Sequence, residues 1–444
     1  MRQLVARASI VCVVMVIHAA LVPARAADTT RTIQKSIDRA FMVGGGRVVV
    51  PAGTHEVTSL RLRSGVELYL ESGAVLQASR NPQDYDDLIV RDGIEPFEAP
   101  RCEILDKLAA SSTSHWNNAI IQIYGARDVM ITGEPGSAID GRNCYDPKGE
   151  EKFRGPHGIA VHFSTNVVFS GYELRNAGNW SHRVCLSADV AVRNVKVRGG
   201  HDGLDFHACD RVTVTDCDLQ AGDDCVAGYD IRNLTVRNCR LNTACSCFRL
   251  GGRDILVEDV VAEAPAVFCH RRSLQKEDLI DGTNPPDRGR RTTLSFFTYY
   301  GAQRARGRSE NIVFRRCRVS GVERLMHYNF SGNEWWQSGQ PLADVTFEDV
   351  NVTGLAYPLH AYAPADTPLL LSFLRCRVHF AGKQAEFMKG ANVGKISIDD
   401  LHVKGVGGAF MRSWLGIPDF DVTNLKGVEP TVVFAVEPFI VKPI

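Results

Sequence analysis

Apolar and polar residues alternate on both sides of an Asn or Asp in a unit that recurs along this chain. The unit reads apolar-x-apolar-x-(Asn/Asp)-(Val/Cys)-x-(Val/Leu), and successive copies starting at Val167, Val190, Val212, Leu234 and Ile255 are 23, 22, 22 and 21 residues apart. Alternation with period two predicts strands, and Asn or Asp tolerates the unusual backbone angles of a tight bend. Each unit is therefore predicted to form two short strands joined by a bend.

A repeat of about this length that lacks helical periodicity is typical of a solenoid built from strands. The unit returns with wider spacing at Ile312, Val345, Leu371 and Ile396. Leucine-rich repeats have a similar period, but their Leu/Asn consensus is absent and β-branched residues occupy the inward positions. We therefore expect an all-β chain that forms a single-domain right-handed parallel β-helix with long loop insertions.

The register of the repeat also assigns structural roles to two sets of residues. One column of the repeat holds Val in some coils and Cys in others, which predicts that these cysteines are small apolar core residues rather than disulfide partners: Cys217, Cys239, Cys317 and Cys376. A second column is predicted to form a ladder of turn residues: Asn194, Asp216, Asn238, Asp259 and Asp349.

Segments outside the repeat complete the predicted architecture. Short strands with glycine turns are expected between 44 and 76, and a helix over about 32–41 is expected to cap the open end of the solenoid. Polar excursions at about 80–117, 142–157 and 265–308 interrupt the coils, and such insertions tend to build walls around a binding face.

Residues 1–26 are predicted to be a signal peptide, with the β-helix catalytic domain over 27–444. Two arginines precede an apolar run that ends before Pro23, and Ala24-Arg25-Ala26 is a small-x-small cleavage site; an uncleaved anchor helix is the alternative. The chain has 51 basic and 51 acidic side chains, which argues against a nucleic-acid partner. We expect a secreted or periplasmic monomer that has no membrane association once the signal is removed.

Candidate chemistry lies where carboxylates recur at the interval of one coil. Asp202 lies 12 residues after Val190 and Asp224 lies 12 after Val212, so both occupy the same place on adjacent coils, with Asp223 beside them. Neighbouring strands are about 4.8 Å apart, and like charges at that separation raise at least one pKa. A protonated and an ionised carboxyl side by side are what cleavage of a glycosidic bond needs. The alternative is a further ladder of turn aspartates on the outer face.

Here the chain resembles glycoside hydrolase family 28, the polygalacturonase-like enzymes. Gly200-His201-Asp202-Gly203-Leu204-Asp205 matches the family's Asn-Thr-Asp-Gly-x-Asp motif at both aspartates and the glycine, and Gly222-Asp223-Asp224 matches its Gly-Asp-Asp motif. Further matches are the segments 45–54 and 66–76 and the pair Asn179-Trp180. The resemblance implies a right-handed parallel β-helix that cleaves with inversion, in which Asp223 is the general acid and Asp202 with Asp224 activates water.

The chain departs from the family pattern in two places. Ser246 stands where the family has the histidine of His-Gly; His201 either takes over part of the proton relay or is a solvent-facing spectator. No Arg-x-Lys follows in the next coil. The candidates to hold a substrate are His201, Asp205, Arg249, Arg271, Arg290 and Arg291. For the arginines the alternative is that they are solvated loop charges. Because rhamnogalacturonan-cleaving members share the Gly-Gly-x-Asp-Gly-x-Asp form found here, the resemblance points away from plain homogalacturonan.

Cys225 and Cys247 are 22 residues apart and so are expected to stack on adjacent coils within disulfide range. The family often has a bridge from the cysteine after Asp-Asp to the following coil, and Cys245 is the other candidate partner. Trp180, Tyr299-Tyr300 and Trp335-Trp336 are candidates to stack on sugar rings or, alternatively, to pack the loops onto the solenoid.

The leading hypothesis is a secreted inverting glycoside hydrolase acting on a pectin-like polysaccharide of galacturonan or rhamnogalacturonan type, without a cofactor or metal. One alternative is a β-helix polysaccharide lyase, in which the aspartates would bind calcium. The other alternative is a carbohydrate-binding solenoid that has no catalytic activity, which the two departures favour.

Overall fold

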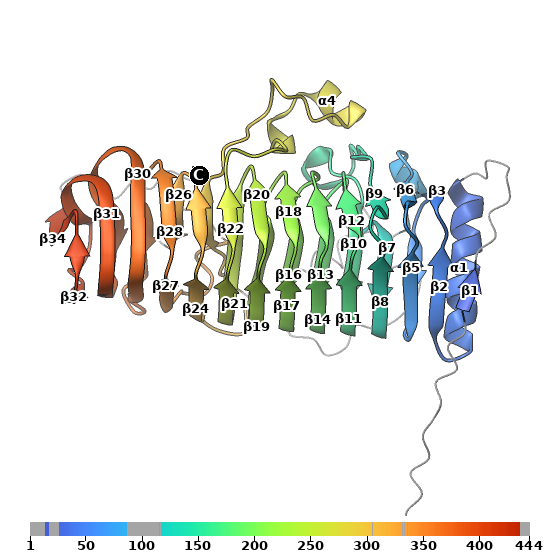
Figure 1. Ribbon diagram of the computed structural model, residues 1–444, viewed down its shortest axis with the longest axis horizontal. Coiled ribbons are helices and arrows are strands. Elements are labelled where there is room, and N and C mark those ends of the chain that lie inside the picture. Colours follow the sequence, from blue (N-terminus) through green and yellow to red (C-terminus); the bar gives the residue numbers. More distant parts are fainter. Residues whose placement is uncertain are drawn as a thin grey trace, which may run out of the picture.

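The computed structural model describes residues 26–435 except 87–114, 116, 304, 331, 333 and 335, together with the backbone of 14–16. Within this part the chain winds into a parallel β-helix with coils stacked side by side along one axis (Figure 1). The named strands pair in parallel from coil to coil, as in Val190↔Val212↔Leu234↔Ile255. The predicted right-handed parallel β-helix is confirmed.

Each complete coil contains three strands, one more than the two predicted from the repeat. The first strands form one face: β4 (Leu60–Leu62), β7 (Ala119–Tyr124), β10 (His157–His162), β13 (His182–Cys185), β16 (Leu204–His207), β23 (Ser295–Tyr299), β26 (Arg324–Asn329) and β29 (Leu359–Tyr362). The second strands are β2 (Gly46–Val50), β5 (Val66–Leu70), β8 (Arg127–Gly133), β11 (Thr165–Ser170), β14 (Ala188–Arg193), β17 (Asp210–Thr215), β24 (Glu310–Arg315) and β27 (Asp344–Glu348).

The third strands are β3 (Gly53–Val57), β6 (Ala74–Ala78), β9 (Ala138–Asp140), β12 (Glu173–Arg175), β15 (Lys196–Arg198), β18 (Asp218–Ala221), β20 (Arg240–Thr243), β22 (Val261–Glu263), β25 (Arg318–Ser320) and β28 (Asn351–Leu355). Longer strands run through more than one face: β19 (Val226–Arg237), β21 (Ser246–Glu258), β30 (Leu369–Ala391) and β31 (Val393–Ser413). The ends are formed by β1 (Val14–Val16) and by β32 (Asp419–Val422), β33 (Leu425–Lys426) and β34 (Glu429–Phe434).

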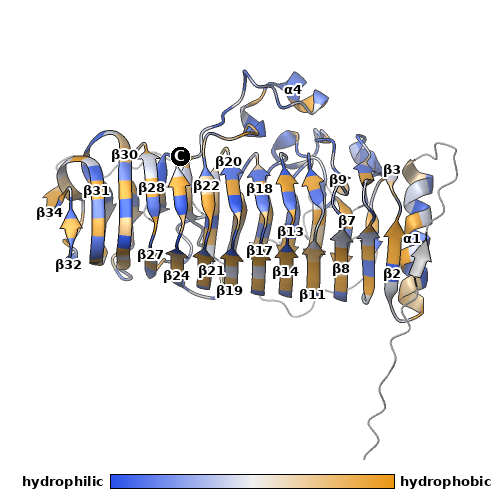
Figure 2. Ribbon diagram, viewed as in Figure 1, coloured by the Kyte–Doolittle hydropathy of each residue, from blue (hydrophilic) through white to orange (hydrophobic). Residues whose placement is uncertain are grey.

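The core fills the inside of the coils because every second residue of a strand points inward. Figure 2 shows the resulting alternation of apolar and polar bands along the strands. Phe314, Phe347 and Phe373 stack on successive coils, with ring centroids 5.3 and 5.6 Å apart. The four column cysteines are buried and free, as predicted: Cys217, Cys239, Cys317 and Cys376.

The predicted turn ladder is present on one edge of the solenoid. All five of its residues have left-handed backbone angles, with φ of 50°, 57°, 56°, 55° and 54° for Asn194, Asp216, Asn238, Asp259 and Asp349. Asn and Asp tolerate this conformation better than other residues with a side chain, which explains their recurrence.

The helix α1 (Ala26–Met42) covers the first coils and buries Ile33, Ile37 and Ala40, which confirms the predicted cap and extends it at the N-terminal side. The predicted signal peptide lies outside the described residues except for the backbone of β1 and Ala26, the first residue of α1. None of the helices in the described ranges has the length and apolarity that a membrane span requires.

The segment containing α4 (Lys276–Asp281) stands above the coils at one edge of the solenoid (Figure 1). Most of the excursion predicted at about 80–117 lies outside the described residues. The interruption predicted at 265–308 is wrong in extent. Strand β23 lies within it and pairs with β21 through Ser246↔Ser295, so a complete strand separates a long excursion over 264–294 from a short one over 300–309. Short 3₁₀ turns lie at η1 (Pro82–Asp84), η3 (Glu150–Lys152) and η4 (Arg271–Ser273).

Candidate active site

The three aspartates of the predicted cluster lie in the turns that lead into the first strands of two adjacent coils. Asp202 precedes β16, and Asp223 and Asp224 precede β19. The main chains are in direct contact, since Gly203 N–H donates to Asp224 O at 2.8 Å. The structure thus places Asp202 and Asp224 one coil apart, as the spacing predicted.

Glycine is required where these two turns stack. Gly200 has φ +74°, a left-handed value that favours glycine, and a Cβ atom on Gly222 would lie 2.4 Å from Gly200 O. The glycines that flank the aspartates therefore allow the two carboxylate-bearing turns to approach each other.

The cluster lies in a cleft of about 710 Å³ on the face of the first strands. Its floor comes from side chains on adjacent coils, and the residues of both excursions, 142–157 and 264–294, form its walls. The lining includes Asp202, Asp205, Asp223, Asp224, Arg154, Arg249, His270 and Trp336. A cleft of this size with convergent polar groups is typical of a small-molecule binding site.

Two of the carboxyls are poised to hold a proton. Burial, followed by the charges of Asp223 and Asp224, raises the pKa of Asp202 well above its ordinary value. Burial and then Asp223 also raise the pKa of Asp224, although Arg249 and the Ser246 N–H, which donates to Asp224 Oδ1 at 2.9 Å, act in the opposite direction. Like charges in a buried cluster disfavour simultaneous ionisation, as predicted.

Asp205 lies within β16, three residues after Asp202, and is ionised. Burial acts against its charge, but contact with His207 and a hydrogen bond from Asp202 outweigh it and lower the pKa of Asp205. Asp205 lines the cleft, as its selection as a substrate-binding candidate requires.

Asp223 has the opposite electrostatics to Asp202. Burial acts against ionisation, but His270 and then Arg154 outweigh it and hold the pKa of Asp223 well below its ordinary value. His270 Nε2 lies 3.2 Å and Arg154 Nη2 3.4 Å from Asp223 Oδ2. Neither partner was predicted from the sequence, because the two residues come from excursions 69 residues before and 47 residues after Asp223 and follow no repeat.

Arg249 faces the cleft and forms its central cation. Its Nη1 lies 3.3 Å from Asp224 Oδ2, and its guanidinium carbon lies 4.3 Å from the Tyr300 ring centroid and 4.5 Å from that of Trp336. The register continues Arg249↔Thr298↔His327 across the next two coils, so the floor extends beyond the cluster. An arginine fixed by a carboxylate and two rings is positioned to bind an anionic group of a ligand.

Of the remaining predicted cationic residues, one lines the cleft and two do not. Arg290 lines the cleft. Arg271 is wrong as a substrate ligand because its side chain is buried and its Nη2 donates to Asn143 O at 3.5 Å. Arg291 is wrong for a related reason: its guanidinium donates to Pro285 O at 2.7 Å within the excursion, and it does not line the cleft.

His201 is buried rather than solvent-facing, which corrects one of its two predicted descriptions. Its side chain is 1% exposed, its ring lies 5.5 Å from that of Phe153, and it is not part of the cleft lining. Burial, followed by Arg154 and Arg271, lowers its pKa well below the ordinary value, so the imidazole is neutral.

The predicted disulfide between Cys225 and Cys247 is not formed in this structure. Both residues are buried free thiols on adjacent coils, since the neighbouring pair Val226↔Phe248 is in register. Cys245 points into the cleft, where its thiol, Asp223 and Asp224 have possible ligand atoms within 4.8 Å of one another.

Only some of the aromatic candidates line the cleft. Trp180, Tyr300 and Trp336 line the cleft, whereas Tyr299 is buried in the core and Trp335 lies outside the described residues.

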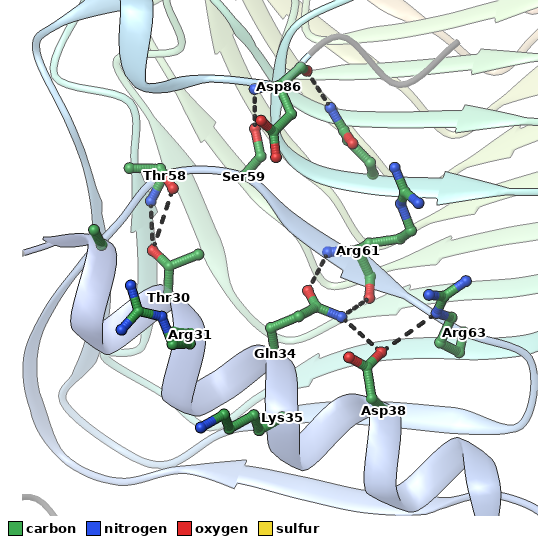
Figure 3. Close-up of a pocket in the computed structure, with 12 residues that line it drawn as sticks. Thr30, Arg31, Gln34, Lys35, Asp38, Thr58, Ser59, Arg61, Arg63 and Asp86 are labelled. Carbon is green, nitrogen blue, oxygen red and sulfur yellow. Dashed lines mark hydrogen bonds and ion pairs between the residues drawn. The ribbon is translucent and has the colours of Figure 1, made fainter. Parts of the chain in front are cut away.

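A second hollow of about 500 Å³ lies between α1 and β4 at the capped end (Figure 3). Its polar groups bond to one another: Gln34 Nε2 donates to Arg61 O at 3.0 Å and to Asp38 Oδ1 at 3.0 Å, and Thr58 N donates to Thr30 Oγ1 at 2.9 Å. These bonds attach the cap to the first coils, four strands along the sheet from the aspartates. This hollow is therefore structural in origin.

Comparisons with known proteins agree with the site. Residues 48–261 match the model of glycosyl hydrolases family 28, a range that contains all three aspartates. A probable polygalacturonase of Vitis vinifera is 29% identical over 201 residues, which are 42% of this chain and 38% of that protein. A polygalacturonase of Saccharomyces cerevisiae is 23% identical over 123 residues, which are 25% of this chain and 34% of that protein. The match thus spans well under half the length of these curated relatives.

Solved structures share the fold over most of the chain. The family 28 exopolygalacturonase of Yersinia enterocolitica has a TM-score of 0.59 at 15% identity, covering 90% of this chain and 75% of its own. The polygalacturonase of Erwinia carotovora has a TM-score of 0.52 at 13% identity, covering 95% of this chain and 99% of its own. The protein is a parallel β-helix with a carboxylate cleft on one face. Over residues 48–261, just under half of the chain, the match to glycosyl hydrolases family 28 confirms the resemblance found in the sequence.

Proposed function

We propose that the protein is an inverting glycoside hydrolase that cleaves a pectin-like polysaccharide, of galacturonan or rhamnogalacturonan type. The observation that carries this proposal is the set of three clustered carboxyls whose environments push their pKa values apart. Asp223 is held ionised, while Asp202 and Asp224 are pushed toward the protonated form. Separated pKa values in one cleft are what acid and base roles at a glycosidic bond require.

In the proposed reaction Asp223 has the role that the family resemblance implies and passes a proton to the leaving oxygen. Because it is ionised at rest, it must first accept that proton from a neighbouring group. Water attacks the anomeric carbon from the opposite side and passes its proton to Asp224, whose carboxylate form is stabilised by Arg249 and by the Ser246 N–H. Asp202 keeps its proton and donates a hydrogen bond to the carboxylate of Asp205, so it contacts the water beside Asp224 without adding a charge.

The proposed substrate class rests on the cations of the cleft. Arg249 is fixed beside the cluster, and Arg290 faces the same space from the excursion wall. A guanidinium group binds a carboxylate through paired hydrogen bonds, so a sugar acid is the ligand these positions favour. The aromatic rings of Trp180 and Trp336 supply flat surfaces for sugar rings.

The test is the release of reducing ends from homogalacturonan, rhamnogalacturonan and neutral polysaccharides, with a chelator present. Asp223→Asn should abolish release, whereas the matched control Asp216→Asn, on the exposed turn ladder, should retain it. Release that continues in Asp223→Asn would contradict the proposal. A lyase would instead need calcium and would form an unsaturated product, and a binding protein would retain polysaccharide without releasing ends from any substrate.

The cellular location is part of the proposal. We infer that residues 1–26 are removed on export and that the domain over 27–444 acts outside the cytoplasm as a monomer, where polysaccharide is found. N-terminal sequencing of the exported protein should begin at Ala27, and gel filtration with light scattering should give the mass of one chain. Retention of the first 26 residues would favour the anchor helix instead.

A further inference from the structure

The histidine that the stacked motifs lack is replaced in space by a residue of the excursion over 264–294. Ser246 occupies the stacked position in the coil after Asp224, and its hydroxyl donates to Thr298 Oγ1 at 3.1 Å. His270 instead enters the cleft from above the coils and lies 3.2 Å from Asp223 Oδ2. An imidazole is thus present at the cluster although the repeat does not provide one.

The two excursions hold this arrangement together. His270 pairs with Arg290 across an antiparallel bridge, its N–H donating to Arg290 O at 2.8 Å, and the Ser273 hydroxyl donates to His270 O at 2.6 Å. From the other excursion, Arg154 is fixed by Glu151 at 2.9 Å. Arg272 Nη1 lies 3.3 Å from Glu151 Oε1 and so connects the two excursions directly.

We propose that His270, with Arg154 as a positioning residue, forms a proton-donating pair with Asp223, and that this pair protonates the leaving oxygen. The inference rests on the proposed hydrolase function. Asp223 accepts contacts from two cationic groups, and of these only the imidazolium can give up its proton. Without such a partner Asp223 would be an ionised carboxylate and would have no proton to donate to the substrate.

Every proton moved in this step has a donor and an acceptor. The Nε2–H of His270 passes its proton through Asp223 to the leaving oxygen as the glycosidic C–O bond breaks, which leaves a neutral imidazole and an ionised Asp223. The attacking water forms the new C–O bond at the anomeric carbon, and its proton passes to Asp224. Solvent then returns a proton to His270, and Asp224 releases one.

The pH dependence of this pair is set by every charged or titratable group that faces Asp223. These groups are Arg154 and His270 from the excursions, His201 and Asp202 from the preceding coil, Asp224 beside it, and Cys245 from the following coil. His201 is buried away from the cleft, and Arg154 keeps its charge, whereas the His270 imidazole lines the cleft beside Asp223.

The experiment compares two leaving groups. Activity is measured on an oligogalacturonide and on the 4-nitrophenyl glycoside of the same sugar, whose nitrophenolate leaves without protonation. His270→Gln should lower kcat on the oligogalacturonide by about 100-fold or more and on the nitrophenyl substrate by less than about 10-fold, with KM little changed. His270→Ala should regain activity on the oligogalacturonide when free imidazole is added. The matched control His379→Gln, on a distant coil, should behave as the unmodified protein.

Two further measurements keep the test decisive. Circular dichroism shows whether each variant folds, and the unmodified protein alone should lose kcat at high pH on the oligogalacturonide but not on the nitrophenyl substrate. Equal losses on both substrates in His270→Gln, or no loss, would overturn the inference while leaving the hydrolase function standing. A selective loss in Asp202→Asn instead would assign the acid to Asp202. An unmodified protein that releases no reducing ends from homogalacturonan, rhamnogalacturonan or the neutral polysaccharides would overturn the proposed function and this inference with it.

Discussion

Two sets of aspartates in this molecule recur from coil to coil, one on the turn ladder and one in the cleft, and their environments differ in almost every respect. Asp259 and Asp349 have side chains 42% and 38% exposed, and each accepts from an arginine of the next coil, Arg316 at 2.7 Å and Arg375 at 2.8 Å. Those hydrogen bonds lower the pKa of both carboxyls. Asp202 is 3% exposed and its pKa is raised.

The contrast shows that stacking carboxylates at the spacing of one coil does not by itself make an active site. On the ladder, Arg316 and Arg375 occupy turn positions of the same column, with φ of 50° and 53°, so acid and base alternate and the charges cancel in solvent. In the cleft, three carboxyls share a buried space, and the cations that reach them do so unevenly. Uneven compensation separates the pKa values, and that separation is useful for catalysis.

The largest expected effect is a difference in catalytic activity between variants of the cleft aspartates and variants of the turn-ladder aspartates. Asp202→Asn should lower kcat/KM by about 10²- to 10⁴-fold, because water activation beside Asp224 loses its partner, whereas Asp259→Asn should leave it unchanged. Initial rates on the cleaved polysaccharide measure both. Comparable losses in the two variants would mean that the cleft and ladder aspartates do not differ in function.

Arg249 is expected to give the next largest effect. Arg249→Met keeps an apolar stem between the Tyr300 and Trp336 rings but removes the charge, so KM for a uronate-containing substrate should rise by about 10-fold or more, equivalent to about 1.4 kcal/mol. Removing the cation also raises the pKa of Asp224 further, which should move the acid limb of the pH–rate profile to higher pH. Rate profiles of the variant and the unmodified protein measure both changes. A KM change of equal size on a neutral substrate would show that the loss is not one of carboxylate binding.

The pH dependence of stability should also differ between the sets. A carboxyl whose folded pKa is raised binds more protons in the folded chain than in the unfolded chain between the two values, so stability falls as pH rises from 3.8 through the folded pKa. Asp202→Asn should remove this loss and make the variant more stable than the unmodified protein at neutral pH. Denaturant unfolding at pH 4 and pH 7 measures the difference. A variant that is less stable at pH 7 would show that Asp202 is compensated more fully than its neighbours indicate.

The sequence predicted those features that repeat and missed those that do not. The fold, the core cysteines, the turn ladder and the stacking of Asp202 on Asp224 all follow from a register of about 22 residues that is visible in the chain. Arg154 and His270 come from excursions with no register, so no spacing relates them to Asp223. Strand β23 was missed because the repeat unit covers only the second and third strands of a coil, whereas the aromatic run of β23 forms a first strand. The signal that could have identified Arg154 and His270 is the combination of a motif without its expected histidine and polar excursions that contain a histidine and an arginine.

The smallest expected effect concerns the turn ladder alone. Asp259→Ala should cost about 1 kcal/mol of stability, because alanine at φ 55° is strained, and Asp259→Gly should cost less because glycine adopts that angle freely. The carboxyl has a lowered pKa, so its contribution is present above the ordinary value of 3.8 and is lost as pH falls through the folded pKa, although solvent screening keeps it small. Thermal unfolding of the two variants at neutral pH separates the backbone cost from the loss of the Arg316 contact, which both variants share. Equal destabilisation by alanine and glycine would mean that the ion pair, and not the left-handed turn, is what selects aspartate on this edge of the solenoid.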